Sequence, residues 1–230
     1  MYFSPTWILL MVVSTVLGLI TRGYVNSTYR KWSRVPLISS QTGAQVARRI
    51  LDADGLSSVP VEQIAGNLTD HYDPRSKTLR LSSSVYQGAS VASAGVAAHE
   101  AGHALQDSHG YAFGRIRSAL VPLANFGSGA SWVLIAIGFF LGVATSLGNG
   151  LIWLGVILFA AAVLFQFVTL PVEFNASRRA LVQLESVAGL PSEQVAGARA
   201  VLTAAALTYV AAALIAALQL LYYIGLARRD

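Results

Sequence analysis

The chain has 230 residues, of which 54% are hydrophobic and only 12% charged, about half the charged fraction of an ordinary soluble domain. Its net charge of +5 raises the question of a nucleic-acid partner. The basic residues lie beside apolar segments without aromatic interleaving, which argues against nucleic-acid binding. Cysteine is absent, so disulfide bonds and thiolate metal sites are excluded, and His, Asp or Glu must hold any metal.

Four apolar segments approach or reach the roughly 17–25 residues that a helix needs to cross a bilayer. They are residues 7–20, 130–147, 151–170 and a run within 200–226. The first lacks a basic leader and a clear cleavage site, so we expect an anchor rather than a cleaved signal peptide; Tyr2 and Phe3 can extend it. The last is rich in Ala, so a helix buried within protein is an alternative to a span.

The distribution of Lys and Arg predicts the orientation in a cell membrane. Residues 22–127 and 171–199 hold fourteen of the sixteen basic residues, and residues 1–6 hold none. The positive-inside rule therefore predicts that both basic segments are cytoplasmic and that the N-terminus is outside. With four spans the tail Arg228-Arg229 falls outside, against the rule, but its two basic residues are outnumbered by the fourteen in the two basic segments. The uncharged link Ser146–Gly150 is expected to be a hairpin turn.

The basic segment 22–127 reads as a polar domain. Thr42 and Gln45 form a capping box that predicts an amphipathic helix over about 43–54, ending before Gly55. Residues 59–65 and 78–82 look like strands, with turn residues at 73–76. A further helix is expected over about 92–106. One face of that helix carries only small side chains, which would let another helix approach closely. These residues are Ala94, Gly95, Ala98, Ala101 and Gly102.

The predicted helix over 92–106 carries the pattern His99-Glu100-Ala101-Gly102-His103. Histidines four residues apart lie on the same helix face, where two imidazoles can reach one zinc ion. Glu100 then lies beside the metal, where it can take a proton from water. Iron or cobalt could be held by the same donors, but an adjacent base favours zinc hydrolysis. The alternative is a helix whose histidines bond to core carbonyls or carboxylates.

A catalytic zinc site needs a third protein ligand, and two candidates compete for it. His109 has the spacing of the pattern H-E-x-x-H-x-x-G-x-x-H, but Gln106 stands where that pattern has its turn-forming Gly. Glu173 is the stronger candidate, because Pro171 can begin a new helix at the end of the third apolar segment and place Glu173 in its first turn. Ser177, one turn later, is expected to support Glu173 or to bond to a histidine ligand.

Three stretches carry a family resemblance: Leu68–Ser76, Ala97–Gln106 and Pro171–Ser177. They resemble the YugP-type neutral zinc metallopeptidases of bacterial membranes, and the likeness covers nearly the whole chain. More distantly the chain is similar to the heat-shock membrane zinc proteases. The resemblance implies that His99, His103 and Glu173 bind Zn²⁺ and that Glu100 is the catalytic base. The distant family has Asp where this chain has Ser177, so that supporting hydrogen bond is expected to be weaker here.

Peptide hydrolysis also needs a donor for the developing oxyanion, and the sequence leaves four candidates open: His71, Tyr72, Tyr86 and Arg178. The strand at 78–82 is expected either to pair with an extended peptide substrate or to be an ordinary strand of the sheet.

The sequence therefore predicts a mostly α, multi-pass membrane protein with four transmembrane helices and a small α+β, zincin-like metalloprotease domain. The expected parts are an anchor, the zinc-motif domain, a transmembrane hairpin, a helix with the third ligand, and a last membrane or membrane-associated helix; they span residues 1–21, 22–127, 128–171, 172–199 and 200–230. The expected function is hydrolysis of membrane or membrane-proximal proteins, with membrane proteins or a second copy as further partners. A non-catalytic scaffold is the alternative, and a transporter is disfavoured because the apolar runs lack charges.

Overall fold

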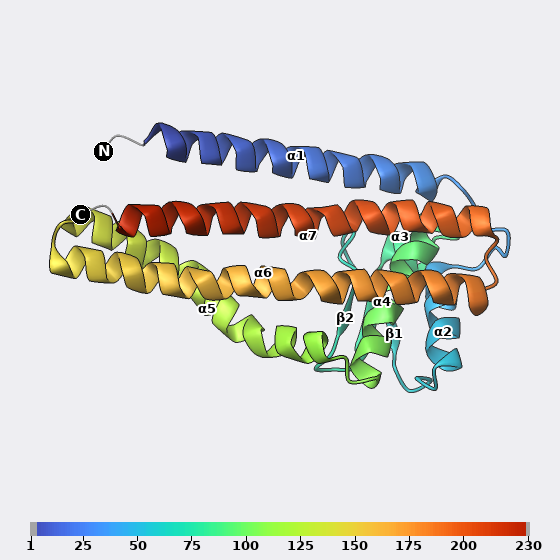
Figure 1. The fold of residues 1–230 in the computed structure, drawn as a ribbon. Coiled ribbons are helices and arrows are strands. Elements are labelled where there is room, and N and C mark those ends of the chain that lie inside the picture. Colours follow the sequence, from blue (N-terminus) through green and yellow to red (C-terminus); the bar gives the residue numbers. More distant parts are fainter. Residues whose placement is uncertain (1–3, 229–230) are drawn as a thin grey trace. The chain divides into compact units, whose positions relative to one another are not determined.

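The computed structural model describes residues 4–228, so Tyr2, Phe3 and Arg229 lie outside the described range. The chain is mostly helical with one small sheet (Figure 1), and its elements are α1 (Pro5–Ser33), α2 (Gly43–Ala53), β1 (Val61–Ile64), β2 (His71–Asp73), β3 (Thr78–Ser82), α3 (Ser83–Tyr86), α4 (Val91–Ser108), α5 (Ala112–Leu141), α6 (Ser146–Ser186) and α7 (Ser192–Ala227). It divides into two compact units. We call residues 1–20, 115–171 and 208–230 the apolar unit, and residues 21–114 and 172–207 the polar unit.

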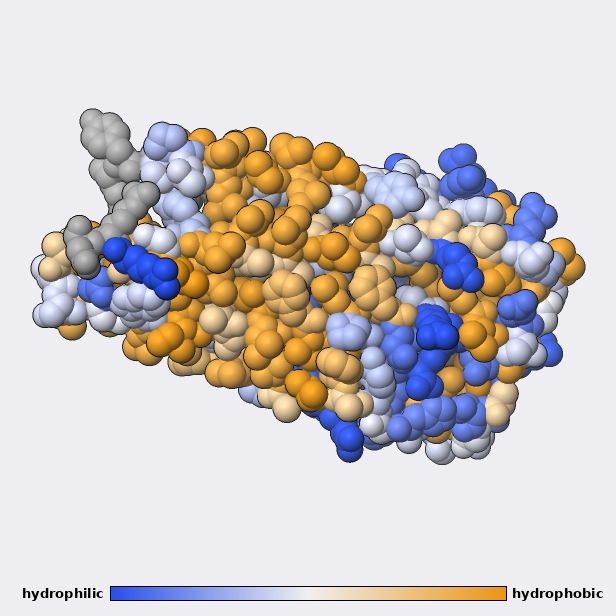
Figure 2. Space-filling model, viewed as in Figure 1, coloured by the Kyte–Doolittle hydropathy of each residue, from blue (hydrophilic) through white to orange (hydrophobic). Residues whose placement is uncertain are grey.

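Among residues 4–228, four helices are long and apolar enough to cross a membrane: α1, α5, α6 and α7. This confirms the number of predicted apolar helices, but the second predicted span, 130–147, runs past the end of α5 at Leu141 into a turn. Figure 2 shows apolar side chains over much of the visible face of the apolar unit. Large examples are Phe126 and Phe140, which are 67% and 89% exposed. An apolar surface of this extent is costly in water and is typical of a protein that contacts lipid.

The turn between α5 and α6 lies at residues 142–145, so the prediction of a turn at Ser146–Gly150 is wrong by four residues. Gly142 adopts a φ of +93°, a conformation that favours glycine and ends α5. The Thr145 hydroxyl accepts a hydrogen bond from the Gly148 backbone N–H at 3.0 Å and so caps the start of α6. The start of α6 is therefore set by the cap residue Thr145, and the absence of charged residues at 146–150 does not mark a turn.

Helix α6 runs without a break through Pro171, so the prediction that this proline begins a new helix is wrong. A proline inside a helix removes one hydrogen bond, and long apolar helices tolerate that loss. Here helical residues continue for more than three turns on each side of it. Glu173 therefore lies in the middle of a long helix, and a helix N-terminus does not account for its position.

The polar unit is built around α2, α4 and the sheet. The predicted capping box of α2 is present: the Thr42 hydroxyl accepts from the Gln45 N–H at 3.3 Å, and the Gln45 side-chain oxygen accepts from the Thr42 N–H at 2.9 Å. Helix α4 covers the predicted 92–106 with one or two residues more at each end. Aliphatic side chains from all three parts form a closed core, including Ile50, Leu79 and Leu105.

The sheet has three strands in the order β1-β3-β2. β1 runs parallel to β3 with Val61 opposite Leu79, and β2 runs antiparallel to β3 with Tyr72 opposite Leu79. Because β3 is central, its backbone is already paired on both sides, and it cannot add a substrate strand. The expectation of substrate pairing at residues 78–82 is therefore wrong, and the alternative of an ordinary strand is right. The edge strand β2 was not predicted.

Candidate metal centre

Helix α4 brings both histidines of the sequence motif to one face. The Ser90 hydroxyl caps the helix start by accepting from the Ser93 N–H at 3.2 Å, and the helix then continues through His103. The imidazole rings of His99 and His103 lie edge to face with centroids 4.7 Å apart. Each side chain keeps 14% of its surface exposed, so the two rings are held by protein yet remain accessible.

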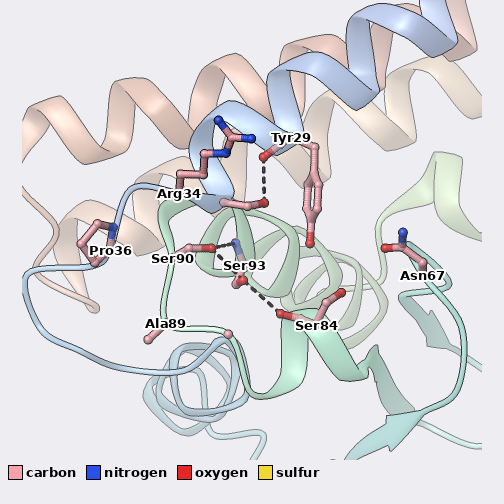
Figure 3. A pocket seen from close by; sticks show the side chains of 10 residues that line it. Tyr29, Arg34, Pro36, Asn67, Ser84, Ala89, Ser90 and Ser93 are labelled. Carbon is pink, nitrogen blue, oxygen red and sulfur yellow. Dashed lines mark hydrogen bonds between the residues drawn. The ribbon is translucent and has the colours of Figure 1, made fainter.

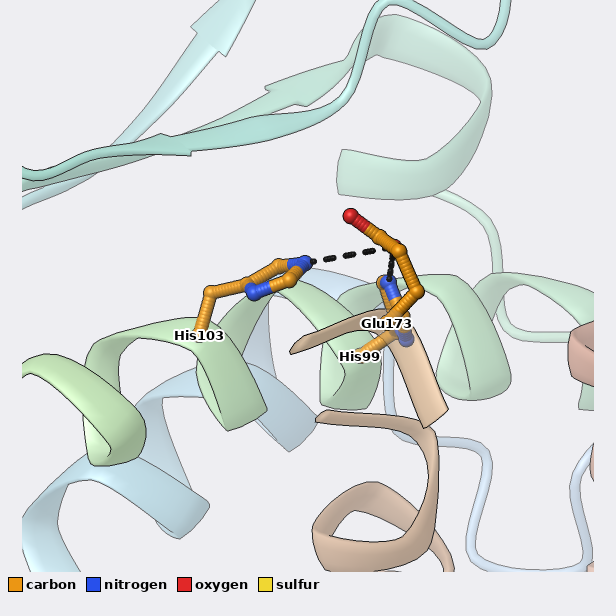
Figure 4. Close-up of side chains that lie close together, drawn as sticks. All are labelled: His99, His103 and Glu173. Carbon is orange, nitrogen blue, oxygen red and sulfur yellow. Dashed lines mark hydrogen bonds and ion pairs between the residues drawn. The ribbon is translucent and has the colours of Figure 1, made fainter. Parts of the chain in front are cut away.

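Glu173 on α6 lies directly against these histidines (Figure 4). Its Oε2 is 3.2 Å from Nε2 of His99 and 3.7 Å from Nε2 of His103. One potential ligand atom from each of the three residues lies within 4.8 Å of the other two. The arrangement thus gathers two imidazole nitrogens and one carboxylate oxygen, the ligand types that catalytic zinc takes in proteins.

The close approach of α4 and α6 depends on the predicted small face of α4. A Cβ placed on Gly102 would lie 2.7 Å from the backbone oxygen of Ala176. A Cβ on Gly95 would lie 3.3 Å from the Cβ of Ala198 on α7. Larger residues at positions 95 and 102 would therefore move α7 and α6 away from α4. The two glycines let α6 approach closely enough for Glu173 to reach the histidines.

The charges of the cluster favour an ionised glutamate. Burial disfavours a charged carboxylate at Glu173, but hydrogen bonds from His103 and His99 outweigh it, and the pKa of Glu173 lies well below its usual range. Burial likewise disfavours a charged imidazole at His103, but the bond to Glu173 and the charge of Glu100 raise the pKa of His103 above its usual value. Two imidazoles around one buried carboxylate form a site that suits a cation.

Ser177 contacts the cluster through His99. Its hydroxyl lies 3.1 Å from Nδ1 of His99, on the side of the ring away from Glu173. Of the two roles expected for Ser177, the structure thus favours the hydrogen bond to a histidine.

Glu100 faces the sheet. Its Oε2 accepts a hydrogen bond from the backbone N–H of Tyr72 on β2 at 3.0 Å, and only 8% of the residue is exposed. The preceding loop adds Asp70, whose carboxylate accepts from the N–H and hydroxyl of Ser82. Burial raises the pKa of Asp70, and the charge of Glu100 adds to the effect although the Ser82 bonds oppose it. Edge strand β2 therefore fixes the carboxylate that the motif assigns as base.

The expected oxyanion donors have other partners or are exposed. His71 is exposed and its Nδ1 lies 2.9 Å from the Thr69 carbonyl oxygen. The Tyr72 hydroxyl donates to Asp107 at 2.7 Å; burial and this bond raise the pKa of Tyr72. Arg178 is exposed on α6. Tyr72 instead contributes to the site through its backbone N–H, which donates to Glu100; the sequence did not suggest this role.

His109 does not join the three clustered residues. Helix α4 continues to Ser108, so the sharp turn that the longer spacing requires does not occur. Six residues are about one and two-thirds turns, which rotates His109 away from the face of His103. Its Nε2 lies 3.0 Å from Asp54 and its Nδ1 lies 2.8 Å from Arg179.

Gln106 and Asn175 belong to the site but were not predicted as such. Gln106 is buried with its Oε1 3.0 Å from Nδ1 of His103, and its amide nitrogen lies 3.0 Å from Oδ1 of Asn175. A signal was present in the sequence, because residues three apart on a helix lie on one face and Gln106 follows His103 at that spacing.

A hollow of about 450 Å³ lies in the polar unit near the start of α4 (Figure 3). Tyr29, Arg34 and Asn67 line it together with serines. Two of those serines bond to each other, since the Ser93 N–H donates to the Ser90 hydroxyl. None of the three clustered residues lines this hollow. It adds no group to the candidate metal centre.

Comparisons with known proteins identify the family of the chain. A model of the family described as "Putative neutral zinc metallopeptidase" matches residues 7–228. The chain is 48% identical over 200 residues to "Putative membrane protease YugP" of Bacillus subtilis (strain 168), and the match covers 87% of each chain. No solved structure matches the chain. Since the family model spans nearly the whole chain and a relative shares almost half of the aligned residues, the chain belongs to the family so described, which confirms the resemblance seen in its motifs.

Proposed function

We propose that the protein is a zinc-dependent membrane endopeptidase in which His99, His103 and Glu173 hold the metal. The observation that carries the proposal is the cluster itself: three potential ligand atoms from two helices lie within 4.8 Å of one another. The family description and the name of the relative from Bacillus subtilis both point to the same class of enzyme.

The residues fit zinc in number and kind. Two imidazoles and one carboxylate leave a fourth position open for water or substrate, as catalytic zinc sites require. The buried carboxylate supplies negative charge where a cation would lie, and its two neighbours are neutral donors once the metal replaces their protons. When bound, zinc lowers the pKa of water and polarises the carbonyl group of a peptide.

Glu100 is the proposed general base and acid. It neighbours the first histidine ligand, and the Tyr72 N–H holds its carboxylate at 3.0 Å. In this position it would accept a proton from the attacking water and return that proton to the leaving amine. His71 and Arg178 remain candidates for stabilising the oxyanion, since both side chains are exposed to solvent.

We propose membrane-anchored proteins as substrates and the cytoplasm as the side of cleavage. Glu173 follows the apolar segment 151–170 by three residues in sequence, and the flanking segments are rich in Lys and Arg, which the positive-inside rule assigns to the cytoplasmic side. A direct test supplies the purified enzyme with a membrane-anchored protein and with its soluble fragment. Equal cleavage of both would contradict a role for the anchor.

The proposed chemistry is tested by metal analysis of the detergent-purified protein together with casein cleavage, with and without a chelator. Glu100→Gln is expected to bind zinc as the unmodified chain does and to lose proteolysis. If that variant binds zinc and cleaves at the unmodified rate, Glu100 is not the base. If it binds zinc and the unmodified chain is also inactive on every substrate tried, the scaffold alternative is favoured.

A further inference from the structure

Gln106 is a buried polar side chain between α4 and α6, and only 3% of it is exposed. On one side its Oε1 lies 3.0 Å from Nδ1 of His103. On the other side its amide nitrogen donates to the backbone oxygen of Val172 at 2.8 Å and to Oδ1 of Asn175 at 3.0 Å. The residue thus links a proposed ligand on α4 to the helix that carries Glu173.

These partners fix which end of the Gln106 amide faces His103. A backbone carbonyl can only accept, so the atom of Gln106 facing Val172 must be the amide nitrogen. The amide of Asn175 is oriented in the same way, because Nε of Arg179, which can only donate, lies 2.9 Å from its oxygen. The atom of Gln106 that faces His103 is therefore the oxygen, and it can only accept.

This direction assigns the proton of the His103 ring. An acceptor at 3.0 Å from Nδ1 requires that Nδ1 carry a hydrogen. When the ring is neutral it has one proton, which Gln106 holds on Nδ1, so Nε2 carries the lone pair; a second proton held on Nε2 by the Glu173 carboxylate is one that a bound metal displaces. Nε2 is the nitrogen that points at Glu173, 3.7 Å from its Oε2. A metal ligand needs such an unprotonated nitrogen in this position.

The hydrogen-bond network extends from Asn175 through Arg179 to the exposed side chain of His109. Arg179 donates from Nη1 to Nδ1 of His109 at 2.8 Å, and Nε2 of His109 lies in an ion-pair contact 3.0 Å from Asp54. The order of donors and acceptors is consistent from Arg179 through Asn175 and Gln106 to His103. Ser177 gives His99 no comparable assignment, because a hydroxyl can either donate or accept.

We propose that Gln106, oriented by Asn175 and Arg179, is a positioning residue that holds His103 as the Nδ1–H tautomer and presents its Nε2 to the metal. This inference rests on the proposed zinc site for its consequence. The position of the proton in the neutral ring is a property of the metal-free protein and can be measured independently of zinc. Loss of such a partner of a metal-bound histidine typically weakens metal binding by about 10- to 100-fold.

The test compares four variants of the full chain in detergent. Gln106→Leu removes the acceptor, and Asn175→Leu removes the oxygen that orients Gln106; Asn175→Asp keeps that oxygen. Gln194→Leu is the matched control, since Gln194 is also a buried glutamine that donates to a backbone oxygen, that of Pro36 at 3.0 Å. Zinc affinity is measured by chelator competition. The ring tautomer is measured by ¹⁵N NMR of the metal-free protein at a pH high enough for the His103 ring to be neutral, and only four histidines contribute to the spectrum.

We expect Nδ1–H at His103 in the unmodified chain, Asn175→Asp and Gln194→Leu. Zinc affinity should be equal in the unmodified chain and Gln194→Leu; Asn175→Asp adds a charge near the site, so only its tautomer is compared. Gln106→Leu and Asn175→Leu are expected to show a mixed or Nε2–H tautomer and zinc affinity about 10- to 100-fold lower. An unchanged tautomer in both Leu variants would overturn the inference, even if zinc binds. If the tautomer changes as expected but the unmodified chain binds no zinc, the positioning role stands and the proposed metal site fails. Should Gln106→Leu not fold, the two Asn175 variants decide.

Discussion

Replacing Gly102 by Ala tests whether the contact between α4 and α6 sets the geometry of the metal site. The added Cβ would lie 2.7 Å from the Ala176 backbone oxygen, whereas ordinary contact begins at 3.4 Å. The two backbones must therefore separate by up to about 0.7 Å, because neither atom belongs to a flexible side chain. Position 102 adjoins His103, and Ala176 lies one turn after Glu173, so the separation acts directly on both proposed ligands.

The expected effect on the site is larger than the effect on stability. Overpacking costs about 1–3 kcal/mol, and the better helix propensity of Ala returns about 1 kcal/mol. The net loss of stability is thus at most about 2 kcal/mol. Metal and catalytic sites tolerate errors of only about 0.5 Å, and a displacement near 1 Å can cost about 100-fold in rate. We expect Gly102→Ala to lower zinc affinity and kcat/KM by about 10- to 100-fold.

Gly95→Ala is the matched control for this experiment. It adds the same group to the same helix, two turns earlier, where the nearest atom is the Cβ of Ala198 at 3.3 Å. A shift of a few tenths of an ångström accommodates it, and the shift involves α7 rather than Glu173. Zinc affinity by chelator competition, casein cleavage and thermal unfolding are compared for the two variants. Unchanged zinc affinity in Gly102→Ala, or an equal loss in Gly95→Ala, would refute the reasoning.

Three further predictions use the same assays. Glu173→Gln is expected to lose zinc because it removes a charged ligand, whereas His109→Ala should keep it; the reverse result would favour the longer histidine spacing. Ser177→Ala removes one hydrogen bond to His99, worth about 1 kcal/mol, so zinc affinity should fall about fivefold, and no change would show that this bond is dispensable. Thr42→Ala removes the cap of α2 and should lower stability by about 1 kcal/mol with zinc affinity unchanged, and a parallel loss of zinc would show that α2 contributes to the site.

The elements that were predicted well are those specified by local chemistry. The capping box at Thr42 predicted the start of α2, and the apolar runs predicted four long helices. Small residues on one face of α4 predicted the close packing that Gly102 makes with Ala176. In each case, residues within a few positions of one another carry the whole signal.

The errors lie where local chemistry is overruled by the surrounding helix or sheet. Pro171 is locally a helix start, but the helical residues on both sides carry α6 through it. The strand at 71–73 is too short to show a periodic pattern, and only its pairing with β3 makes it a strand. That pairing in turn makes β3 central, which is why residues 78–82 cannot accept a substrate strand.

In the candidate site, too, the residues specified by local spacing were predicted, and the residue that depends on distant partners was not. His99, Glu100 and His103 were predictable because one helix turn relates them, and Glu173 because the residues around it resemble a family. Gln106 was not predicted as a site residue although it lies one turn from His103, because its proposed role depends on Asn175, 69 positions later. A glutamine amide can face a neighbour with either its oxygen or its nitrogen, and the sequence does not say which. Only the donors and acceptors contributed by α6 decide the direction, and with it the ring nitrogen that His103 offers to a metal.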